Sequence, residues 1–314
     1  MMEQYSADQV FSLKLKEQNK AFNPQDNIIL LTFDDNYLAQ AINLILSVAR
    51  HNPEGVSFIC VCPPLKQSSI SELLSMKQGI QLRCYDFSFK FETGRWSVCT
   101  FLRLYAAWLL DEEIKRVLYM DADMLCSGSL QELFNMDVHC VAMCNEISGN
   151  VSSTQQRVFR PVVPTQIYCN AGVSLFNLDY LREHHSFDEI YQAYNNMHDK
   201  IAYLDQDFLN IYFHEKIQVL NAFHYNFQPN ELWGTPYYKA ALKNCRLLHF
   251  AVGKPWIYKT RFFLIRLYLK HSEYEPIIRR VRKTYFLSAL YWPIRFARHM
   301  LSPLKQAYLE RKNS

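Results

Sequence analysis

The sequence contains little glycine, and it lacks the glycine-rich loops that hold phosphate groups through backbone N–H donors. Only 8 of its 314 residues are glycine, and neither G-x-G-x-x-G nor G-x-x-x-x-G-K-[ST] occurs. A site for a phosphorylated ligand would therefore need side chains and a metal ion in place of such a loop.

Nine cysteines are present, but they lack the patterns of a disulfide framework or a zinc site. Their number is odd, no C-x-x-C occurs, and most fall inside apolar runs. This pattern predicts buried, reduced thiols, as in proteins of the cytosol.

Long hydrophobic segments are absent as well. No stretch approaches the roughly 18 apolar residues that would span a bilayer, and the polar residues 1–20 lack the apolar core of a secretory signal. We therefore expect a protein that is made and kept inside the cell.

Charge is unevenly distributed along a chain whose composition is 49% hydrophobic, 20% charged and 15% aromatic. Residues 254–314 carry 14 Lys and Arg against 3 Asp and Glu, a balance of +11, whereas the rest of the chain has a balance of −7. A mildly acidic body followed by a basic tail indicates that the chain has two distinct parts. We expect a polar lead over residues 1–26, one catalytic domain over 27–256 and a helical segment over 257–314.

Strands and helices are expected to alternate through the first 120 residues. Continuous apolar runs predict buried strands at 27–33, 56–62, 80–85 and 116–120, and apolar residues at helical spacing predict helices at 37–50, 68–77 and 97–110. Further along, strands are expected at 167–178 and 246–251 and helices at 187–196 and 205–213. This alternation predicts an α/β fold with a single doubly wound, Rossmann-like sheet.

Two acidic clusters come directly after two of these strands. Asp34 and Asp35 follow the first strand, and Asp121 and Asp123 follow the fourth. Ligands of such sheets bind beyond the carboxyl ends of the strands, so both clusters should lie along one rim. Carboxylates at i and i+2 form a compact oxygen site that suits Mn²⁺ or Mg²⁺.

Five sequence blocks resemble glycosyltransferase family 8, the retaining UDP-sugar transferases that include bacterial lipopolysaccharide galactosyl- and glucosyltransferases. The blocks are LLTFDDNYLAQA at 30–41, FLRLYAAWLLDEEIKRVLYMDADML at 101–125, YCNAGVSLFNLDYLRE at 168–183, YLDQDFLN at 203–210 and LLHFAVGKPW at 247–256. The resemblance covers residues 27–256 and implies the GT-A type of fold. The lead and the basic, aromatic tail look most like the lipopolysaccharide-core members.

The resemblance also implies the roles of individual residues. Asp121, Asp123 and His249 would bind manganese, and Lys254 would neutralise the diphosphate. The catalytic residues would be Gln206 and Asp205. The wider UDP-sugar site would comprise Asp34, Asn36, Tyr37, Arg103, Asp121, Ala122, Asp123, Asn170, Ala171, Asp205, Gln206, His249, Gly253 and Lys254. Within it, the Tyr37 ring would stack on the uracil.

One departure from the family pattern concerns the last block. The usual order is H-[FY]-x-G-x-x-K-P-W, whereas here His249 is followed by Phe-Ala-Val-Gly-Lys. The loop is one residue shorter and Gly253 stands beside Lys254, which affects how far Lys254 can reach.

Several residues also allow plainer interpretations. His249, within an apolar strand, could be a satisfied core histidine, and Arg103 could be a solvated arginine. Asn170, Ala171 and Gly172 could form only a tight bend, and Asp205 could only cap a helix. We interpret Asp207 as a surface or capping charge.

How configuration is retained does not follow from the sequence. Retaining glycosidases use two flanking carboxylates, but here Gln206 stands where a nucleophile would be expected. We favour front-face attack, with Gln206 stabilising an oxocarbenium-like state and the leaving phosphate accepting the proton of the acceptor. A covalent intermediate is the alternative, and neither glucose nor galactose is preferred as the donor sugar.

The acceptor expected from the resemblance is a lipid-linked saccharide of lipopolysaccharide or lipooligosaccharide. Aromatic residues interleaved with Lys and Arg after residue 256 predict helices, broken near Pro293 and Pro303, that lie on an anionic membrane surface. No nucleic-acid motif accompanies them, so we expect no nucleic-acid partner. The enzyme would then be cytoplasmic, at the inner face of the cell membrane. Two alternatives remain, a soluble glycogenin-like or polyol transferase and a catalytically silent protein of the same fold.

Overall fold

The computed structural model describes residues 11–18, 23, 27–76, 80–89, 98–147, 167–197, 199–258 and 260–290. The strands are β1 Phe11–Gln18, β2 Ile28–Thr32, β3 Ser57–Cys62, β4 Gln81–Phe89, β5 Arg116–Asp121, β6 Met124–Cys126, β7 Val141–Asn145, β8 Cys169–Asn177, β9 Ile217–Leu220 and β10 Leu247–His249. The helices are α2 Leu38–His51, α3 Gln67–Leu74, α4 Val98–Leu109, α5 Gln131–Phe134, α7 Leu178–His184, α8 Phe187–Met197, α9 Leu204–Tyr212, α10 Ala222–Tyr225, α11 Pro229–Leu232, α12 Tyr238–Asn244 and α13 Phe262–His271. Residues 275–290 are also helical.

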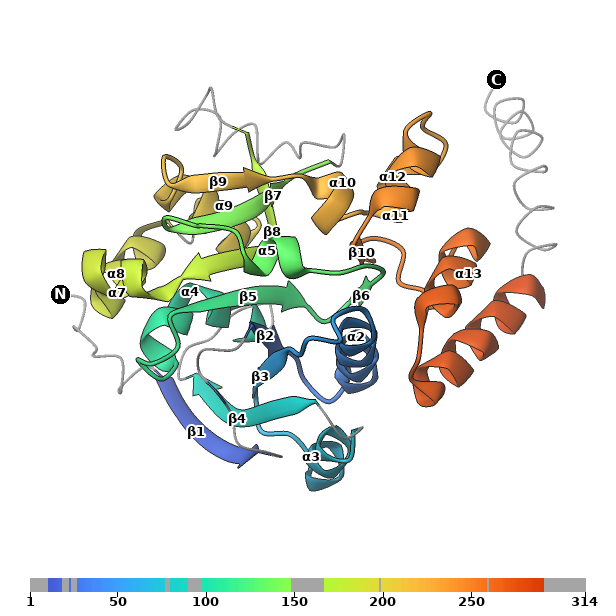
Figure 1. Ribbon diagram of the computed structural model, residues 1–314, viewed down its shortest axis with the longest axis horizontal. Coiled ribbons are helices and arrows are strands. Elements are labelled where there is room, and N and C mark those ends of the chain that lie inside the picture. Colours follow the sequence, from blue (N-terminus) through green and yellow to red (C-terminus); the bar gives the residue numbers. More distant parts are fainter. Residues whose placement is uncertain are drawn as a thin grey trace, which may run out of the picture.

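A central sheet of eight strands in the order β1-β4-β3-β2-β5-β8-β7-β9 carries the fold (Figure 1). Strands β4, β3, β2 and β5 run parallel, as the alternation of strands and helices predicts. Strands β1 and β8 run antiparallel to their neighbours, and β7 pairs parallel with β9. The predicted α/β class with a doubly wound sheet is therefore confirmed, with antiparallel strands added at β1 and β8.

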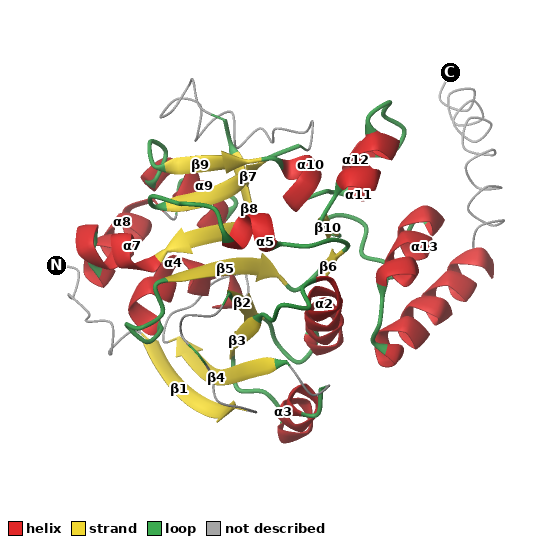
Figure 2. Cartoon of the chain, viewed as in Figure 1, coloured by secondary structure: helices red, strands yellow, loops and turns green. Residues whose placement is uncertain are grey.

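Helices cover both faces of this sheet because its strands are apolar on both faces (Figure 2). Ile28 and Leu30 of β2 point into a core shared with α4, α7, α8 and α9. Ile29 and Leu31 point into a second core on the other face, shared with α2 and α3. All four side chains are at most 3% exposed. Such continuous apolar runs are typical of strands buried on both faces.

Two segments of the sheet are not evident from hydrophobic pattern. Within the polar lead, β1 pairs with β4 from Phe11 to Gln18 although it contains Lys14, Lys16 and Glu17. At the opposite edge, β9 is short, and Gln218 and Val219 are exposed. Both are edge strands, and edge strands need only one apolar face.

A third, smaller core joins the C-terminal helices to the body. Leu264 and Tyr268 of α13 and Ile277 and Val281 of the helix 275–290 are buried against residues of the small β10–β6 sheet and the loops around it. The described C-terminal helices, up to residue 290, are thus packed on the body of the protein. The predicted helices broken near Pro293 and Pro303 lie outside the described residues.

All nine cysteines are buried and form no disulfide, as their spacing predicts. Burial raises the pKa of most of these thiols, for example that of Cys126 to about 12, which makes them poor nucleophiles. In the described ranges, no helix combines the length and the apolar character needed to cross a bilayer.

Candidate active site

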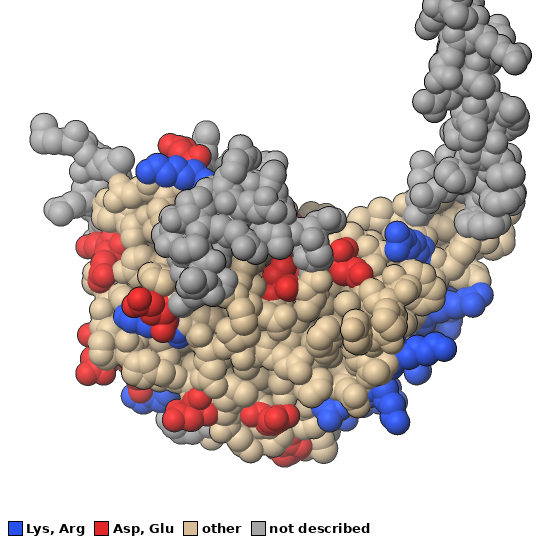
Figure 3. Space-filling model, turned by 90° about the horizontal axis from the view of Figure 1, so that it is seen from above, with Lys and Arg blue, Asp and Glu red and all other residues tan. Residues whose placement is uncertain are grey.

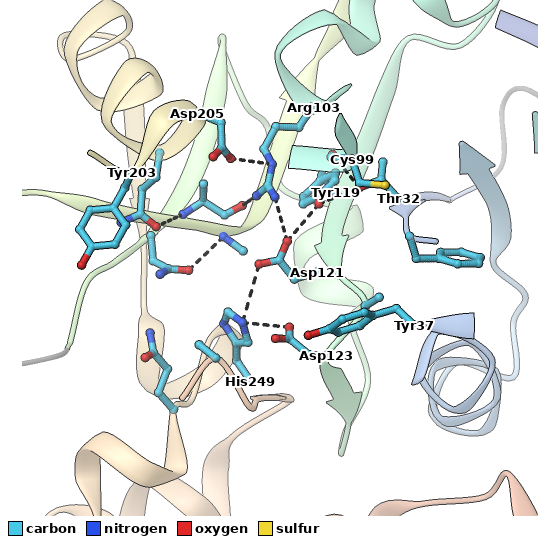
Figure 4. Close-up of a pocket in the computed structure, with 18 of the residues that line it drawn as sticks. Thr32, Tyr37, Cys99, Arg103, Tyr119, Asp121, Asp123, Tyr203, Asp205 and His249 are labelled. Atoms are coloured by element: carbon cyan, nitrogen blue, oxygen red, sulfur yellow. Dashed lines mark hydrogen bonds and ion pairs between the residues drawn. The ribbon is translucent and has the colours of Figure 1, made fainter. Parts of the chain in front are cut away.

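Three side chains from distant parts of the chain converge at the carboxyl-terminal rim of the sheet (Figure 4). Ligand atoms of Asp121, Asp123 and His249 all lie within 4.8 Å of one another. His249 Nε2 lies 3.7 Å from Asp121 Oδ2 and 3.1 Å from Asp123 Oδ1. The sequence prediction that these three residues come together is therefore confirmed.

Strand pairing explains how His249 reaches the two aspartates. The chain turns sharply after β5, so Asp121 ends β5 and Asp123 immediately precedes β6. Strand β10 then pairs antiparallel with β6, with His249 opposite Met124. The Asp123 carbonyl oxygen accepts the Phe250 N–H at 3.1 Å, which continues this pairing by one more hydrogen bond.

The donor set of this cluster suits a divalent cation. Two carboxylates and one imidazole are ordinary ligands of Mn²⁺. Ligands held at about 2.1 Å from one cation lie at most about 4.2 Å apart, so a closure of under about 1 Å would bring these three atoms into contact with a single ion. Asp123 Oδ1 is buried and has no hydrogen-bond partner in the described part of the chain. A buried acceptor without a donor is costly, and a cation would satisfy it.

Asp123 is also held between two basic groups. Its other oxygen pairs with the Lys254 ammonium, and His249 lies on the opposite side. Although burial acts to raise it, the attraction of His249 and Lys254 holds the pKa of the Asp123 carboxyl below its usual range. Asp123 is therefore an anion at any physiological pH.

Arg103 joins the cluster to a third carboxylate. It comes from α4, is 6% exposed, and contacts both Asp121 Oδ1 and Asp205 Oδ2 at 2.9 Å. Its guanidinium also donates to the Ala171 carbonyl and lies 4.0 Å from the centre of the Tyr119 ring. The solvated-arginine interpretation is wrong, because Arg103 is a buried cation that orients two aspartates.

The pKa values of the buried pair reflect this arrangement. Burial raises the pKa of Asp205 to about 6 in spite of the adjacent Arg103. Although burial acts to lower it, the pKa of Arg103 is raised by Asp205, Tyr119 and Asp121. Asp205 is not the N-cap residue of α9, which is Tyr203, although its carboxylate accepts backbone N–H groups in the first turn of the helix. The same carboxylate faces Arg103.

Gln206 is held in one orientation at the edge of the cavity. Its Oε1 accepts the Ala171 N–H at 3.1 Å and its Nε2 donates to the Tyr168 hydroxyl at 3.0 Å. Asn210, one turn later on α9, bonds both the N–H and the carbonyl of Cys169 at 2.7 Å. These bonds fix α9 against β8, so the position and orientation of the Gln206 side-chain amide are fixed as well.

Asp207 corrects a prediction made from the sequence. It is 1% exposed and not on the surface. Its carboxylate accepts the N–H groups of Ala202 and Tyr203 at 2.9 Å and the Tyr168 hydroxyl at 2.5 Å. The surface interpretation is wrong, because Asp207 lies inside α9 and its carboxylate binds the backbone of the loop that precedes the helix.

The first acidic cluster forms the turn between β2 and α2. Asp34 Oδ1 accepts the backbone N–H groups of Asn36 at 3.0 Å and Tyr37 at 3.2 Å, and the Asn36 amide donates to Asp34 Oδ2. Asp34 and Tyr37 line the cavity, and Tyr37 packs edge-on against Trp256 at 6.2 Å. Asn36 is exposed and does not line it, so its contribution is to shape the turn.

Gly253 likewise shapes a loop. Its φ of 78° favours glycine, and an added Cβ would lie 2.6 Å from Leu264 Cδ1. Gly253 does not line the cavity, whereas Lys254 does. Although burial acts to lower it, attraction to Asp123 raises the pKa of Lys254 above its ordinary value. The shortened loop therefore still delivers a fixed cation to the cluster.

A cavity of about 740 Å³ unites these groups. Twelve of the fourteen predicted binding residues line it, the exceptions being Asn36 and Gly253. Lining residues that the sequence did not identify are Thr32, Phe33, Cys99, Tyr119, Glu146, Gly172, Tyr203, Gln228, Glu231, Ala251 and Val252. Seven of them lie inside the five sequence blocks that resemble the family, so their neighbours in the chain could have indicated them. Glu146, Gln228 and Glu231 lie outside all five blocks and carried no such signal.

Gly172 explains why the N-A-G segment lies in this strand. An added Cβ would lie 2.6 Å from His249 Cε1 and 2.9 Å from both Asn170 Oδ1 and Asp121 Oδ2. The backbone therefore approaches the cluster more closely than any side chain would permit. The segment lies within β8, where the register with β7 shifts, and its backbone approaches His249 and Asp121 closely.

Comparison with known proteins agrees with this geometry. The model of the family described as glycosyl transferase family 8 matches residues 28–260. The chain is 28% identical over 201 residues to glycosyltransferase GlyB of Streptococcus pneumoniae, covering 59% of this chain and 45% of that protein. It is 28% identical over 138 residues to a lipopolysaccharide 1,3-galactosyltransferase of Salmonella typhimurium, covering 41% of this chain and 40% of that protein.

Solved structures show the same fold. The galactosyltransferase LgtC, crystallised with donor and acceptor sugar analogues, superposes with a TM-score of 0.61 at 20% identity, over 82% of this chain and 95% of that one. This chain spans less than two thirds of the length of the first curated relatives it matches. The family match nevertheless extends through β2 to β10, and with them through every element that carries the site. The chain belongs to glycosyltransferase family 8.

Proposed function

We propose that this protein is a retaining hexosyltransferase that moves glucose or galactose from a UDP-sugar to a lipopolysaccharide or lipooligosaccharide acceptor. The observation that carries the proposal is the convergence of Asp121, Asp123 and His249 at one wall of the cavity. Family membership supports sugar transfer, and the fold is one that suggests a nucleotide-sugar donor and a divalent metal.

Residues of the cluster would hold Mn²⁺ or Mg²⁺ between the protein and the diphosphate of the donor. A cation bound there supplies Lewis-acid stabilisation of the negative charge that develops on departing UDP. Lys254 would contribute a second, fixed positive charge from the protein. At the turn between β2 and α2, Asp34 and Tyr37 would bind the nucleoside, with the Tyr37 ring against the uracil.

The donor sugar would lie between Arg103, Asp205 and Gln206. Arg103 and Asp205 offer donors and acceptors in a buried pair, which suits bidentate bonds to sugar hydroxyls. The Gln206 oxygen already accepts one N–H and retains a second lone pair, which would stabilise positive charge developing at the anomeric carbon. Retention would then proceed by front-face attack, because an amide is a poor nucleophile. Isolation of a glycosyl–enzyme adduct would refute this scheme.

The choice of acceptor rests on relatives that are named as lipopolysaccharide transferases. Besides the Salmonella enzyme, the chain is 22% identical over 188 residues to a lipopolysaccharide 1,2-glucosyltransferase of Escherichia coli, covering 57% of this chain and 55% of that protein. These relatives use two different sugars, so they support a hexose without distinguishing glucose from galactose.

Attachment to an anionic membrane surface would come from the C-terminal segment, residues 257–314. On the helix 275–290, buried residues recur at helical spacing, and the outward face carries Arg279, Arg282, Lys283, Phe286 and Leu290. Lys and Arg gather on that side of the molecule in Figure 3. Each such cation near an anionic surface contributes on the order of 1 kcal/mol. The protein would then act in the cytoplasm, at the inner face of the membrane.

Release of UDP tests the proposal. Purified protein is incubated with UDP-glucose, UDP-galactose and other UDP-sugars, with Mn²⁺ or with EDTA, and liberated UDP is measured. We expect release from one of the two hexose donors, its loss in EDTA and its recovery on addition of excess Mn²⁺. Failure to bind or hydrolyse any UDP-sugar would favour a catalytically silent protein. Transfer to glycogen or to a polyol without a lipid-linked acceptor would favour the soluble alternative.

A further inference from the structure

His249 makes a second contact that determines how its ring meets the cluster. Its Nδ1 lies 2.7 Å from Oδ1 of Asn226, a residue with 0% of its surface exposed. A neutral imidazole has one N–H and one lone pair, and an amide oxygen can only accept. If Asn226 presents oxygen to the ring, Nδ1 carries the proton and Nε2 directs its lone pair at Asp121 and Asp123.

The orientation of the Asn226 amide is itself fixed by Asn170. Asn226 Nδ2 donates to Asn170 Oδ1 at 2.8 Å. Asn170 Oδ1 also accepts the backbone N–H of Gly172 at 2.9 Å, and Asn170 Nδ2 donates to Glu146 Oε2 at 2.9 Å. A backbone N–H only donates and a carboxylate only accepts, so both ends of the Asn170 amide are specified. Reversing the Asn226 amide would place its oxygen against Asn170 Oδ1, so that two acceptors would face each other.

We propose that Asn226 is a positioning residue for the cation site, because it holds His249 in the tautomer and ring orientation that a metal ligand needs. Partners of this kind are common around metal-bound histidines, where they fix the ring and increase its basicity. The inference rests on the proposed function, since it concerns the same site, but it assigns a role to a residue outside the cavity lining. No reacting atom touches Asn226.

The network also limits what Asn170 can offer a donor sugar. Both lone pairs of its Oδ1 are used, by the Gly172 N–H and by Asn226. One N–H of its Nδ2 is used by Glu146, which leaves a single N–H for any ligand. Asn170 therefore acts mainly on Asn226 and through it on His249.

Spectroscopy of bound Mn²⁺ tests the proposal on the full-length protein, without isotope labelling. Mn²⁺ affinity is measured by electron paramagnetic resonance, and coordination by the ¹⁴N modulation that a directly bound imidazole produces in the spin echo. Asn226→Leu fills the same space without an acceptor, and Asn226→Asp restores an acceptor for the Nδ1 proton. A matched control is Asn43→Leu, which removes another amide with 0% exposure whose partners, among them Tyr268, lie outside the cavity lining.

We expect Asn226→Leu to bind Mn²⁺ about 10- to 100-fold more weakly and to lose the ¹⁴N modulation. Asn226→Asp should retain the modulation and weaken binding by less than about tenfold, and Asn43→Leu should match the wild type. If Asn226→Leu fails to fold, Asn226→Ser, which removes the amide without adding apolar bulk, takes its place with the same expectation.

Equal affinity and equal modulation in wild type and Asn226→Leu would overturn the positioning role while leaving the proposed function intact. Equal losses in Asn226→Asp and Asn226→Leu would also overturn it, because the acceptor would then not be the determinant. A wild-type protein that binds no Mn²⁺ would overturn both this inference and the metal-dependent function.

Discussion

Replacing Gly172 by alanine should impair the cation site while leaving the fold in place. The added Cβ would lie 2.6 Å from His249 Cε1, and ordinary contact begins at 3.4 Å. The ring would have to retreat by about 0.8 Å, whereas metal sites tolerate deviations of about 0.2 Å in ligand distance. Asp121 Oδ2, at 2.9 Å, would be pushed in a different direction.

We expect Gly172→Ala to bind Mn²⁺ at least about tenfold more weakly and to release UDP from its donor correspondingly more slowly at a fixed Mn²⁺ concentration. Overpacking of a rigid site should also lower the free energy of unfolding by about 1–3 kcal/mol in metal-free protein. Affinity is read by Mn²⁺ titration and stability by urea denaturation.

Gly128→Ala is the matched control for this variant. Its added Cβ would lie 2.5 Å from Arg246 Cδ, but Arg246 is an exposed, flexible side chain that can move aside. Mn²⁺ affinity should therefore remain at the wild-type value. Gly172→Ala protein that binds Mn²⁺ as tightly as the wild type would refute the reasoning, because the three side chains could then not be the ligands.

Three further predictions concern charge. Arg103→Met leaves Asp205 buried without its cation, and breaking a buried ion pair costs about 3–5 kcal/mol. The free energy of unfolding, measured by urea denaturation, should fall by that amount. A fall below about 1 kcal/mol would contradict the assignment of Arg103 and Asp205 as a buried pair. The folded pKa of Asp205, about 6, lies above its unfolded value of about 3.9, so its contribution to stability is present below about pH 4 and is lost as the pH rises through 6. In metal-free Asp205→Asn protein, the free energy of unfolding should lack this decline of about 3 kcal/mol. Parallel curves of unfolding free energy against pH in variant and wild type would refute the prediction. Removal of residues 291–314 together with Arg279→Glu, Arg282→Glu and Lys283→Glu should release the protein from anionic vesicles in a sedimentation assay while leaving UDP release intact, and unchanged sedimentation would exclude the membrane role of the C-terminal segment.

Much of the fold could be predicted because apolar periodicity is a local property. Strands β2, β3 and β5 are continuous apolar runs, so their burial on both faces and their parallel pairing follow from pattern alone. The same pattern also predicts that the two acidic clusters lie along one rim of the sheet. In the structure, Thr32 at the end of β2 pairs directly with Asp121 at the end of β5. Strand β1 escaped prediction because its alternating charged residues suit an edge strand as well as a loop.

Residues of the candidate site could be predicted where they lie inside one of the five sequence blocks that resemble the family. Asp121, Asp123 and His249 are cases of this kind, although 126 positions separate His249 from Asp123 and only the β6–β10 pairing brings them together. Asn226 and Glu146 could not be found, since each lies between blocks and acts through hydrogen bonds that depend on tertiary packing. The burial of Arg103 and Asp207 was equally inaccessible, because charged residues on a helix are usually solvated.

The most direct test of the account is a crystal of the protein grown with Mn²⁺ and UDP and measured near the manganese absorption edge. We predict a single anomalous peak within bonding distance of Asp121, Asp123 and His249, with the diphosphate on its open side. A peak elsewhere, or none at this place with the three side chains well ordered, would contradict the central claim that they hold one divalent cation.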